Sequence, residues 1–109
     1  MDATYRVLVR GRFGELDERA RASLLDSAAD HDLLKAAFTT DGTLTYDRSL
    51  LGFAFRYEVV TAGDNAERDA RDEAQLRTEA TMSDAGYPVR DLRVSATSMS
   101  DIPIRRKTR

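Results

Sequence analysis

Two short segments carry the side chains best suited to acid–base chemistry. His31, the only histidine, is followed by Asp32, and Tyr46 is followed by Asp47. An imidazole oriented by a carboxylate is a common general base, and a phenol can donate a proton. Adjacent residues of a helix do not face each other, however, and a histidine near a helix C-terminus also has a structural reason to be there. The sequence therefore leaves two hypotheses: a catalytic pair of His31 and Tyr46, or a structural role for both.

The sequence argues against the other common kinds of catalytic or metal site. It contains no cysteine, which excludes disulfides, thiolate metal sites and cysteine nucleophiles. No serine lies in a G-x-S-x-G motif, and neither a phosphate-binding loop nor a G-x-G-x-x-G turn occurs. The acidic residues between 67 and 73 are expected on the solvent side of a helix. We therefore expect no metal centre and no cofactor.

Residues 52–57, GFAFRY, match four positions in the signature of RNA-recognition modules. In those modules the aromatic residues of this segment face outward and stack on bases. Here alternation places Phe53, Phe55 and Tyr57 on one side of a strand, and Arg56 and Glu58 on the other. Burying two unpaired charges costs on the order of several kcal/mol each, whereas burying large apolar side chains gains about 1.5–3 kcal/mol apiece. The sequence therefore predicts buried rings and disfavours RNA binding.

If the rings are buried, the opposite face of the sheet displays arginines. A guanidinium group is a planar fork that fits the oxygens of a carboxylate or a phosphate. We therefore predict that this face binds an anionic small molecule or a partner; the alternative is a solvated or interface surface. The predicted ligand-binding residues are Arg6, Arg10, Arg56, Glu58 and Arg93.

Hydrophobic periodicity predicts the elements that position these residues. Alternating side chains predict strands at 4–13, 51–61 and 90–97. Apolar residues three and four apart predict helices that begin near Asp17 and Asp64, the second of which ends at Gly86. Within residues 35–47, Asp41-Gly42 predicts either a hairpin turn or a bend in one kinked strand.

This order of elements is that of the ferredoxin-like βαββαβ sandwich, an α+β fold in which two helices cover one face of an antiparallel sheet. An extra hairpin in the second strand region is compatible with it. We predict a single domain at 1–104, followed by a frayed basic tail at 105–109. Since the first and third strands are central in this fold, their arginines should converge on one patch.

The charge distribution bears on the partners of the protein. The whole chain has a net charge of −2, and its last five residues, RRKTR, carry four positive charges, so residues 1–104 carry −6. An acidic body with a short basic tail is unlike a general nucleic-acid binder. No basic leader precedes an apolar run, and no stretch approaches the roughly 18 apolar residues of a membrane span. These features predict a soluble, cytoplasmic protein without membrane contact.

Three segments carry a resemblance to a known family. They read HDLLKAAFTTDGTLTYD at 31–47, FAFRY at 53–57 and IRRK at 104–107. Through them, nearly the whole chain resembles a family of small bacterial proteins of unknown function. The resemblance implies no substrate and no catalytic residue, but it directs attention to His31, Asp32, Tyr46 and Arg56.

The features of the sequence together favour a small accessory or binding protein, acting as a homodimer, with an anionic small molecule or a partner on the arginine-bearing face. A small cofactor-independent enzyme that uses His31 and Tyr46 for acid–base chemistry is the alternative. RNA binding is a second alternative, which strand parity disfavours. The identity of a ligand, the reaction and the pathway are not indicated by the sequence.

Overall fold

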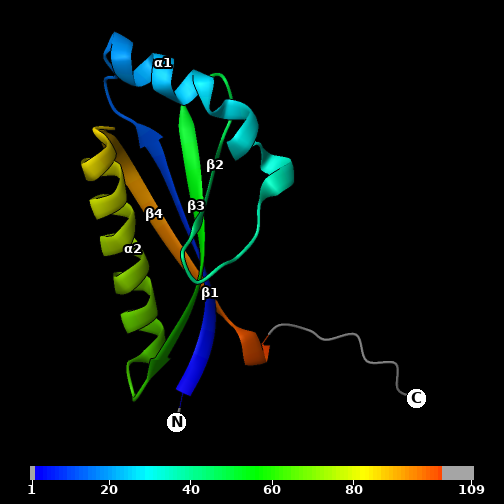
Figure 1. Ribbon diagram of the computed structural model, residues 1–109. Coiled ribbons are helices and arrows are strands. Elements are labelled where there is room, and N and C mark those ends of the chain that lie inside the picture. The colour runs from blue at the N-terminus through cyan, green and yellow to red at the C-terminus, as the bar shows by residue number, and fades with distance from the viewer. Residues whose placement is uncertain (1, 102–109) are drawn as a thin grey trace.

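The computed structural model describes residues 2–101, which form an α+β fold with one four-stranded antiparallel sheet. The strand order is β2-β3-β1-β4, so β1 and β3 are central, as the ferredoxin-like prediction requires. Helix α2 lies along one face of the sheet, and α1 crosses one end of it (Figure 1). The strands and α-helices are β1 (Asp2–Phe13), α1 (Glu18–Asp26), β2 (Thr43–Tyr46), β3 (Gly52–Ala62), α2 (Ala66–Ala85) and β4 (Val89–Ser98). The predicted tail at 105–109 and the last residues of the predicted domain lie outside the described residues.

The central strands β1 and β3 place their aromatic side chains and most of their large aliphatic ones on the helix side of the sheet; Leu8 and Val60 lie on the other face. Phe53, Phe55 and Tyr57 are each 5% exposed or less, and Val7 and Val9 on β1 are fully buried. The two strands pair in antiparallel register over their whole length, with Val9 opposite Phe55. The predicted sidedness of the sheet is therefore confirmed, and these aromatic rings are not free to stack on bases.

The pairing of β1 with β4 contains one irregularity, at Gly11. Arg10 pairs with Arg93 and Arg12 pairs with Arg90, so β4 has one more residue than β1 between these two pairs, as in a β-bulge. A Cβ atom on Gly11 would lie 2.6 Å from side-chain atoms of both Leu92 and Phe53. Only glycine fits here, because the two apolar side chains close over the position where a side chain would begin.

Each helix is fixed by a recognisable terminus. The Asp17 side chain accepts a hydrogen bond from the Ala20 backbone N–H at 2.8 Å, which confirms the predicted start of α1. After α1, a 3₁₀ turn (Ala28–His31) carries the chain toward the β2 edge of the sheet, and a second short turn (Leu33–Lys35) follows. Helix α2 ends at Gly86, whose φ of 82° is the left-handed conformation that glycine adopts without strain.

The chain reverses direction at Asp41-Gly42, as the turn signal predicted. The backbone N–H of Gly42 donates to the Thr39 carbonyl at 3.2 Å, and the hydroxyls of Thr39 and Thr43 lie 3.1 Å apart across the turn. The arm before the turn makes only one isolated β-bridge, between Thr39 and Tyr57. The predicted extra hairpin is thus reduced to a turn, a bridge and the four-residue strand β2.

Replacing Gly42 by alanine should destabilise the fold more than the same change at Gly63. Both residues have positive φ, 89° and 95°, but a Cβ on Gly42 would lie 2.2 Å from the Tyr57 ring, whereas a Cβ on Gly63 would have no neighbour within 4 Å. We expect Gly63→Ala to cost about 1–2 kcal/mol from backbone strain, and Gly42→Ala about 1–3 kcal/mol more from overpacking. Urea denaturation of both variants measures the difference, and equal losses would contradict the close packing of Gly42 on Tyr57.

Candidate functional site

The five predicted ligand-binding residues all lie on the sheet face opposite the helices. Cross-strand pairing places Arg10 opposite Arg93 and Arg6 opposite Glu58, while Arg56 pairs with Leu8. Arg6, Arg10 and Arg93 are exposed, and Arg56 and Glu58 are half-buried. We call this surface the open face.

Four arginines gather at one end of the open face. Arg10 and Arg93 face each other directly across β1 and β4, and Arg12 and Arg90 do so beyond the bulge. Like charges in directly opposite positions of a sheet repel each other. Within residues 2–100, no carboxylate lies within 4.0 Å of any of these four guanidinium groups. We call Arg10, Arg12, Arg90 and Arg93 the arginine cluster.

The arginine cluster borders two shallow hollows that share Arg10 and Arg93. One, of about 300 Å³, is also lined by Leu8, Val94 and Ser95. The other, of about 250 Å³, is lined by Gly11, Arg12 and Asp91 as well as by the two shared arginines. The first hollow therefore offers two guanidinium groups beside the apolar Leu8, and the second is bordered by three arginines, one aspartate and a glycine.

Arg6 and Arg56 stand apart from the cluster and already have partners. Arg56 donates from Nη1 to the Thr45 hydroxyl at 3.0 Å, and the Arg6 guanidinium lies over the Phe38 ring, 5.4 Å from its centroid. Arg6 lies four positions before Arg10 along β1, which corresponds to roughly 13 Å. Arg56 is a diagonal neighbour of Arg10, but its guanidinium is directed to Thr45 on β2. The structure thus brings Arg10 and Arg93 directly opposite each other, while Arg6, Arg56 and Glu58 lie elsewhere on the same face.

Two members of the cluster, Arg12 and Arg90, were missed by sequence reasoning. Alternation along β1 already places Arg12 on the same side as Arg10, so this residue could have been included. Arg90 could not, because its position opposite Arg12 depends on the extra residue of the bulge at Asp91, whose φ is 56°. The signal for that bulge in the sequence is Gly11 alone.

His31 and Tyr46, the predicted catalytic residues, do meet. Their rings stack with centroids 5.3 Å apart, and the His31 Nδ1 lies 3.0 Å from the Leu44 carbonyl oxygen. The Tyr46 hydroxyl is directed inward and donates to the Leu24 carbonyl at 2.6 Å. The Tyr46 side chain is 6% exposed, and burial raises its pKa. The phenol proton is therefore used in a hydrogen bond to a backbone carbonyl, as expected for a tyrosine that stabilises the fold.

A hollow of about 260 Å³ lies beside Tyr46 and is lined in part by Asp32, Asp47 and Arg48. The Asp47 carboxylate accepts hydrogen bonds from the Ser49 hydroxyl and the Ser49 backbone N–H, which lower its pKa. Asp32 accepts from the Leu34 N–H at 2.8 Å and starts the second 3₁₀ turn. Both carboxylates thus serve the local backbone, as capping residues do.

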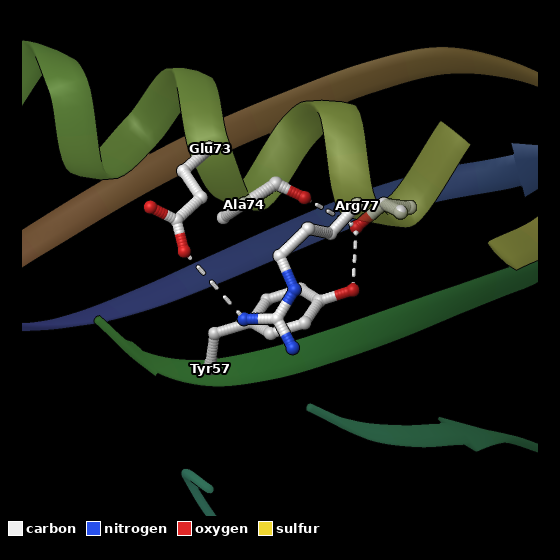
Figure 2. Close-up of polar contacts among 5 residues, drawn as sticks. Tyr57, Glu73, Ala74 and Arg77 are labelled. Carbon is white, nitrogen blue, oxygen red and sulfur yellow. Dashed lines mark hydrogen bonds and ion pairs between the residues drawn. The ribbon is translucent and has the colours of Figure 1, made fainter. Parts of the chain in front are cut away.

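A second buried tyrosine, Tyr57, forms a polar cluster under α2 (Figure 2). The Thr78 hydroxyl donates to the Ala74 carbonyl at 2.9 Å, so the Tyr57 hydroxyl, 3.2 Å away, donates to Thr78. The Arg77 guanidinium covers the ring at 4.9 Å from its centroid and pairs with Glu73 at 3.7 Å. Burial raises the Tyr57 pKa, although the Thr78 bond and the Arg77 charge both oppose this. The buried hydroxyls of this cluster are all satisfied, and none of them faces a hollow.

The described part of the chain has neither a cluster of metal-ligating side chains nor a membrane-crossing helix. Residues 2–101 contain no group of three or more histidine, aspartate or glutamate side chains placed to hold a metal ion. None of the helices there combines the length and apolar character that crossing a bilayer requires.

Comparison with known proteins matches the chain to one family over its full length. Residues 1–109 correspond to DUF6204, which is described as a family of unknown function. Neither the curated proteins nor the solved structures yielded a match.

The Tyr46 hydroxyl should matter for stability more than that of Tyr87. Tyr46→Phe leaves the buried Leu24 carbonyl without its donor, which we expect to cost about 1–3 kcal/mol in the free energy of unfolding. Tyr87→Phe removes an exposed hydrogen bond to Ser23 and should cost less than about 1 kcal/mol. Chemical denaturation of the two variants tests this, and a Tyr46→Phe protein as stable as the parent would argue that the phenol has another role.

Stability should fall in alkaline solution because the pKa values of the buried Tyr46 and Tyr57 are raised. Burial raises the pKa of Tyr46 and of Tyr57 above the ordinary value, so above about pH 10 the unfolded chain loses phenol protons that the folded chain retains. Stability is therefore fully present below this pH and is lost as the pH rises toward the raised pKa values. Urea denaturation from about pH 9 to about pH 11 measures the slope. A Tyr46→Phe/Tyr57→Phe variant should show a shallower slope, and an identical one would contradict the assignment.

Proposed function

Because the chain belongs to the DUF6204 family of unknown function, its role has to be argued from geometry, and we propose a small binding protein that takes an anion at the arginine cluster. The anion is a phosphate or carboxylate group of a small molecule. Arg10 and Arg93 hold it, and Arg12 and Arg90 add positive charge beside them.

The observation that carries this proposal is the pairing of like charges. Folding alone gains nothing from placing Arg10 opposite Arg93 and Arg12 opposite Arg90, since each pair repels. No carboxylate of residues 2–100 comes within 4.0 Å to neutralise them. A bound anion between the guanidinium groups turns this repulsion into two charge-assisted interactions. Anion binding therefore offsets the repulsion between the guanidinium groups, which lowers the stability of the free protein.

The surroundings of the cluster restrict the kind of anion. Two guanidinium forks offer donors to at least two oxygen atoms, which suits a phosphate monoester or a dicarboxylate better than a single carboxylate. Leu8 lies in the same hollow and provides a surface for a short apolar group. We therefore expect a ligand with a doubly charged head and a small apolar remainder.

The alternative of an enzyme rests on the stacked His31 and Tyr46 rings beside a hollow of about 260 Å³. It is the weaker proposal, because the phenol proton is held by the Leu24 carbonyl and the hollow is not lined by His31. RNA binding is weaker still. With Phe53 and Phe55 at 5% and 4% exposure, RNA contact through the open face would be electrostatic only and would vanish with salt.

The homodimer expected from the sequence fits this function only through a surface other than the open face. Stacking two open faces would bring together two surfaces on which Glu58 is outnumbered by exposed or half-buried arginines. Such an interface would carry a large electrostatic penalty and would bury the anion site. The cytoplasmic location stays a prediction.

Removing one arginine of the opposed pair should have two opposite effects. Without an anion, Arg93→Ala relieves repulsion with Arg10 and should raise the free energy of unfolding by a few tenths of a kcal/mol to about 1 kcal/mol at low salt. With inorganic phosphate or pyrophosphate, the parent should be stabilised in proportion to the logarithm of ligand concentration, and Arg93→Ala should lose most of that stabilisation.

Thermal denaturation with increasing pyrophosphate at fixed ionic strength measures both effects. Arg21→Ala, at an exposed position on α1, is the matched control and should respond to pyrophosphate like the parent. If pyrophosphate raises the melting temperature of Arg93→Ala as much as that of the parent, the anion does not bind at the arginine cluster.

A further inference from the structure

No strand among residues 2–101 pairs with the outer edge of strand β4. It is ten residues long, pairs only with β1, and lies at the end of the sheet. The Val94 carbonyl accepts a hydrogen bond from the Arg71 side chain at 3.3 Å, so it points away from β1. Backbone groups alternate in direction along a strand, so Leu92, Val94 and Ala96 all direct their N–H and C=O groups outward. An unpaired edge of this length is a template for another strand.

The apolar side chains of the same three residues are incompletely buried. Leu92, Val94 and Ala96 point to the helix side of the sheet but remain partly exposed, in contrast to the fully buried Val7 and Val9 of the neighbouring strand. Beside them, a hollow of about 360 Å³ is lined by Leu92 and Val94 together with Arg68, Arg71, Asp72 and Gln75 of α2. The core is thus open along the β4 edge.

We propose that a second copy of this chain occupies this edge, with the two β4 strands paired antiparallel about a two-fold axis at Val94. This register places Val94 of one copy opposite Val94 of the other, and Leu92 opposite Ala96. Each copy then covers the partly exposed apolar row of the other, and the two sheets join into one of eight strands. The N–H and C=O groups of Leu92, Val94 and Ala96, which point away from β1, then form hydrogen bonds between the two copies.

One pair of opposite charges on α2, Arg68 and Asp72, is complementary to itself across the same axis, while the two Arg71 side chains, each paired with Glu67 of its own copy, lie on either side of it. The bond from Arg71 to Val94 sets this part of α2 level with the axis, and Arg68 and Asp72 flank it within the same hollow. The two-fold therefore brings Arg68 of each copy to Asp72 of the other. On the open face, Arg93 meets Ser95 of the second copy, so no new pair of like charges forms directly opposite each other.

This pairing would also enlarge the anion site, a consequence that rests on the proposed function. Arg93 lies next to Val94, so the two Arg93 residues approach the axis from both sides, with Cα atoms roughly 8 Å apart from ordinary strand spacings. The hollow beside Arg10 and Arg93 borders β4, so the hollows of the two copies become neighbours. A ligand with two anionic groups, such as pyrophosphate, would then bind more tightly to the dimer than to the monomer.

Charge reversal on α2 tests the interface without touching the core. Arg68 and Asp72 are exposed, so Arg68→Asp and Asp72→Arg should both fold. By sedimentation velocity we expect the parent to dimerise, each single reversal to weaken dimerisation by about tenfold or more, and the double reversal to restore it. Asp84→Arg, exposed near the end of α2, is the matched control and should dimerise like the parent. A monomeric parent, or single reversals that dimerise normally, would overturn the proposal.

Hydrogen exchange locates the interface independently. The amides of Leu92, Val94 and Ala96 should exchange slowly in the dimer and at least tenfold faster in Arg68→Asp at a protein concentration where sedimentation shows this variant to be monomeric, because only the second copy provides their acceptors. Unchanged exchange rates at these amides would place the interface elsewhere.

Pyrophosphate titration of the parent and of Arg68→Asp separates the two proposals. Tighter binding to the parent supports a shared site. Equal binding contradicts the sharing but leaves the anion site intact, and no binding to either protein contradicts the anion site while leaving the dimer untouched.

Discussion

The burial of one row of aromatic rings governs the rest of this structure. Phe53, Phe55 and Tyr57 occupy alternate positions of a central strand, and the helices can cover only one face of the sheet. Once the rings are placed under α2, the intervening residues Arg56 and Glu58 have to lie on the other face. The same constraint acts on β1, so the arginines of both strands share a surface because the apolar residues share the core.

The bulge at Gly11 adds a second constraint, which acts directly on the arginine cluster. Leu92 and Phe53 close over Gly11, and the extra residue in β4 is accommodated by the positive φ of Asp91. This local geometry puts Arg90 opposite Arg12 while Arg93 stays opposite Arg10. Two repulsive pairs lie within one short length of sheet as a result. Each pair lowers the stability of the free protein, and the anion proposed above would offset this repulsion.

The buried phenols contrast with the exposed guanidinium groups. Tyr46 donates to a backbone carbonyl, and Tyr57 donates to a threonine that itself donates to a carbonyl. Each hydroxyl ends a short chain of hydrogen bonds inside the core, and burial raises the pKa of both tyrosines. Groups held in this way stabilise the fold. Among residues 2–100, by contrast, the guanidinium groups of the arginine cluster have no carboxylate within 4.0 Å, and no strand pairs with the outer edge of β4.

The sequence by itself determined the elements, their order and the sidedness of the sheet, because a period of two and the cost of burying charge act locally along each strand. Through the strand order of the ferredoxin-like fold, it also predicted that Arg6, Arg10, Arg56 and Arg93 share one face. Only the tertiary structure decided that these two residues stand directly opposite, that Arg12 and Arg90 join them, and that His31 stacks on Tyr46. Register between strands distant in the sequence depends on the bulge and on how side chains such as Leu92 and Phe53 fit together, and neither is encoded in any single segment.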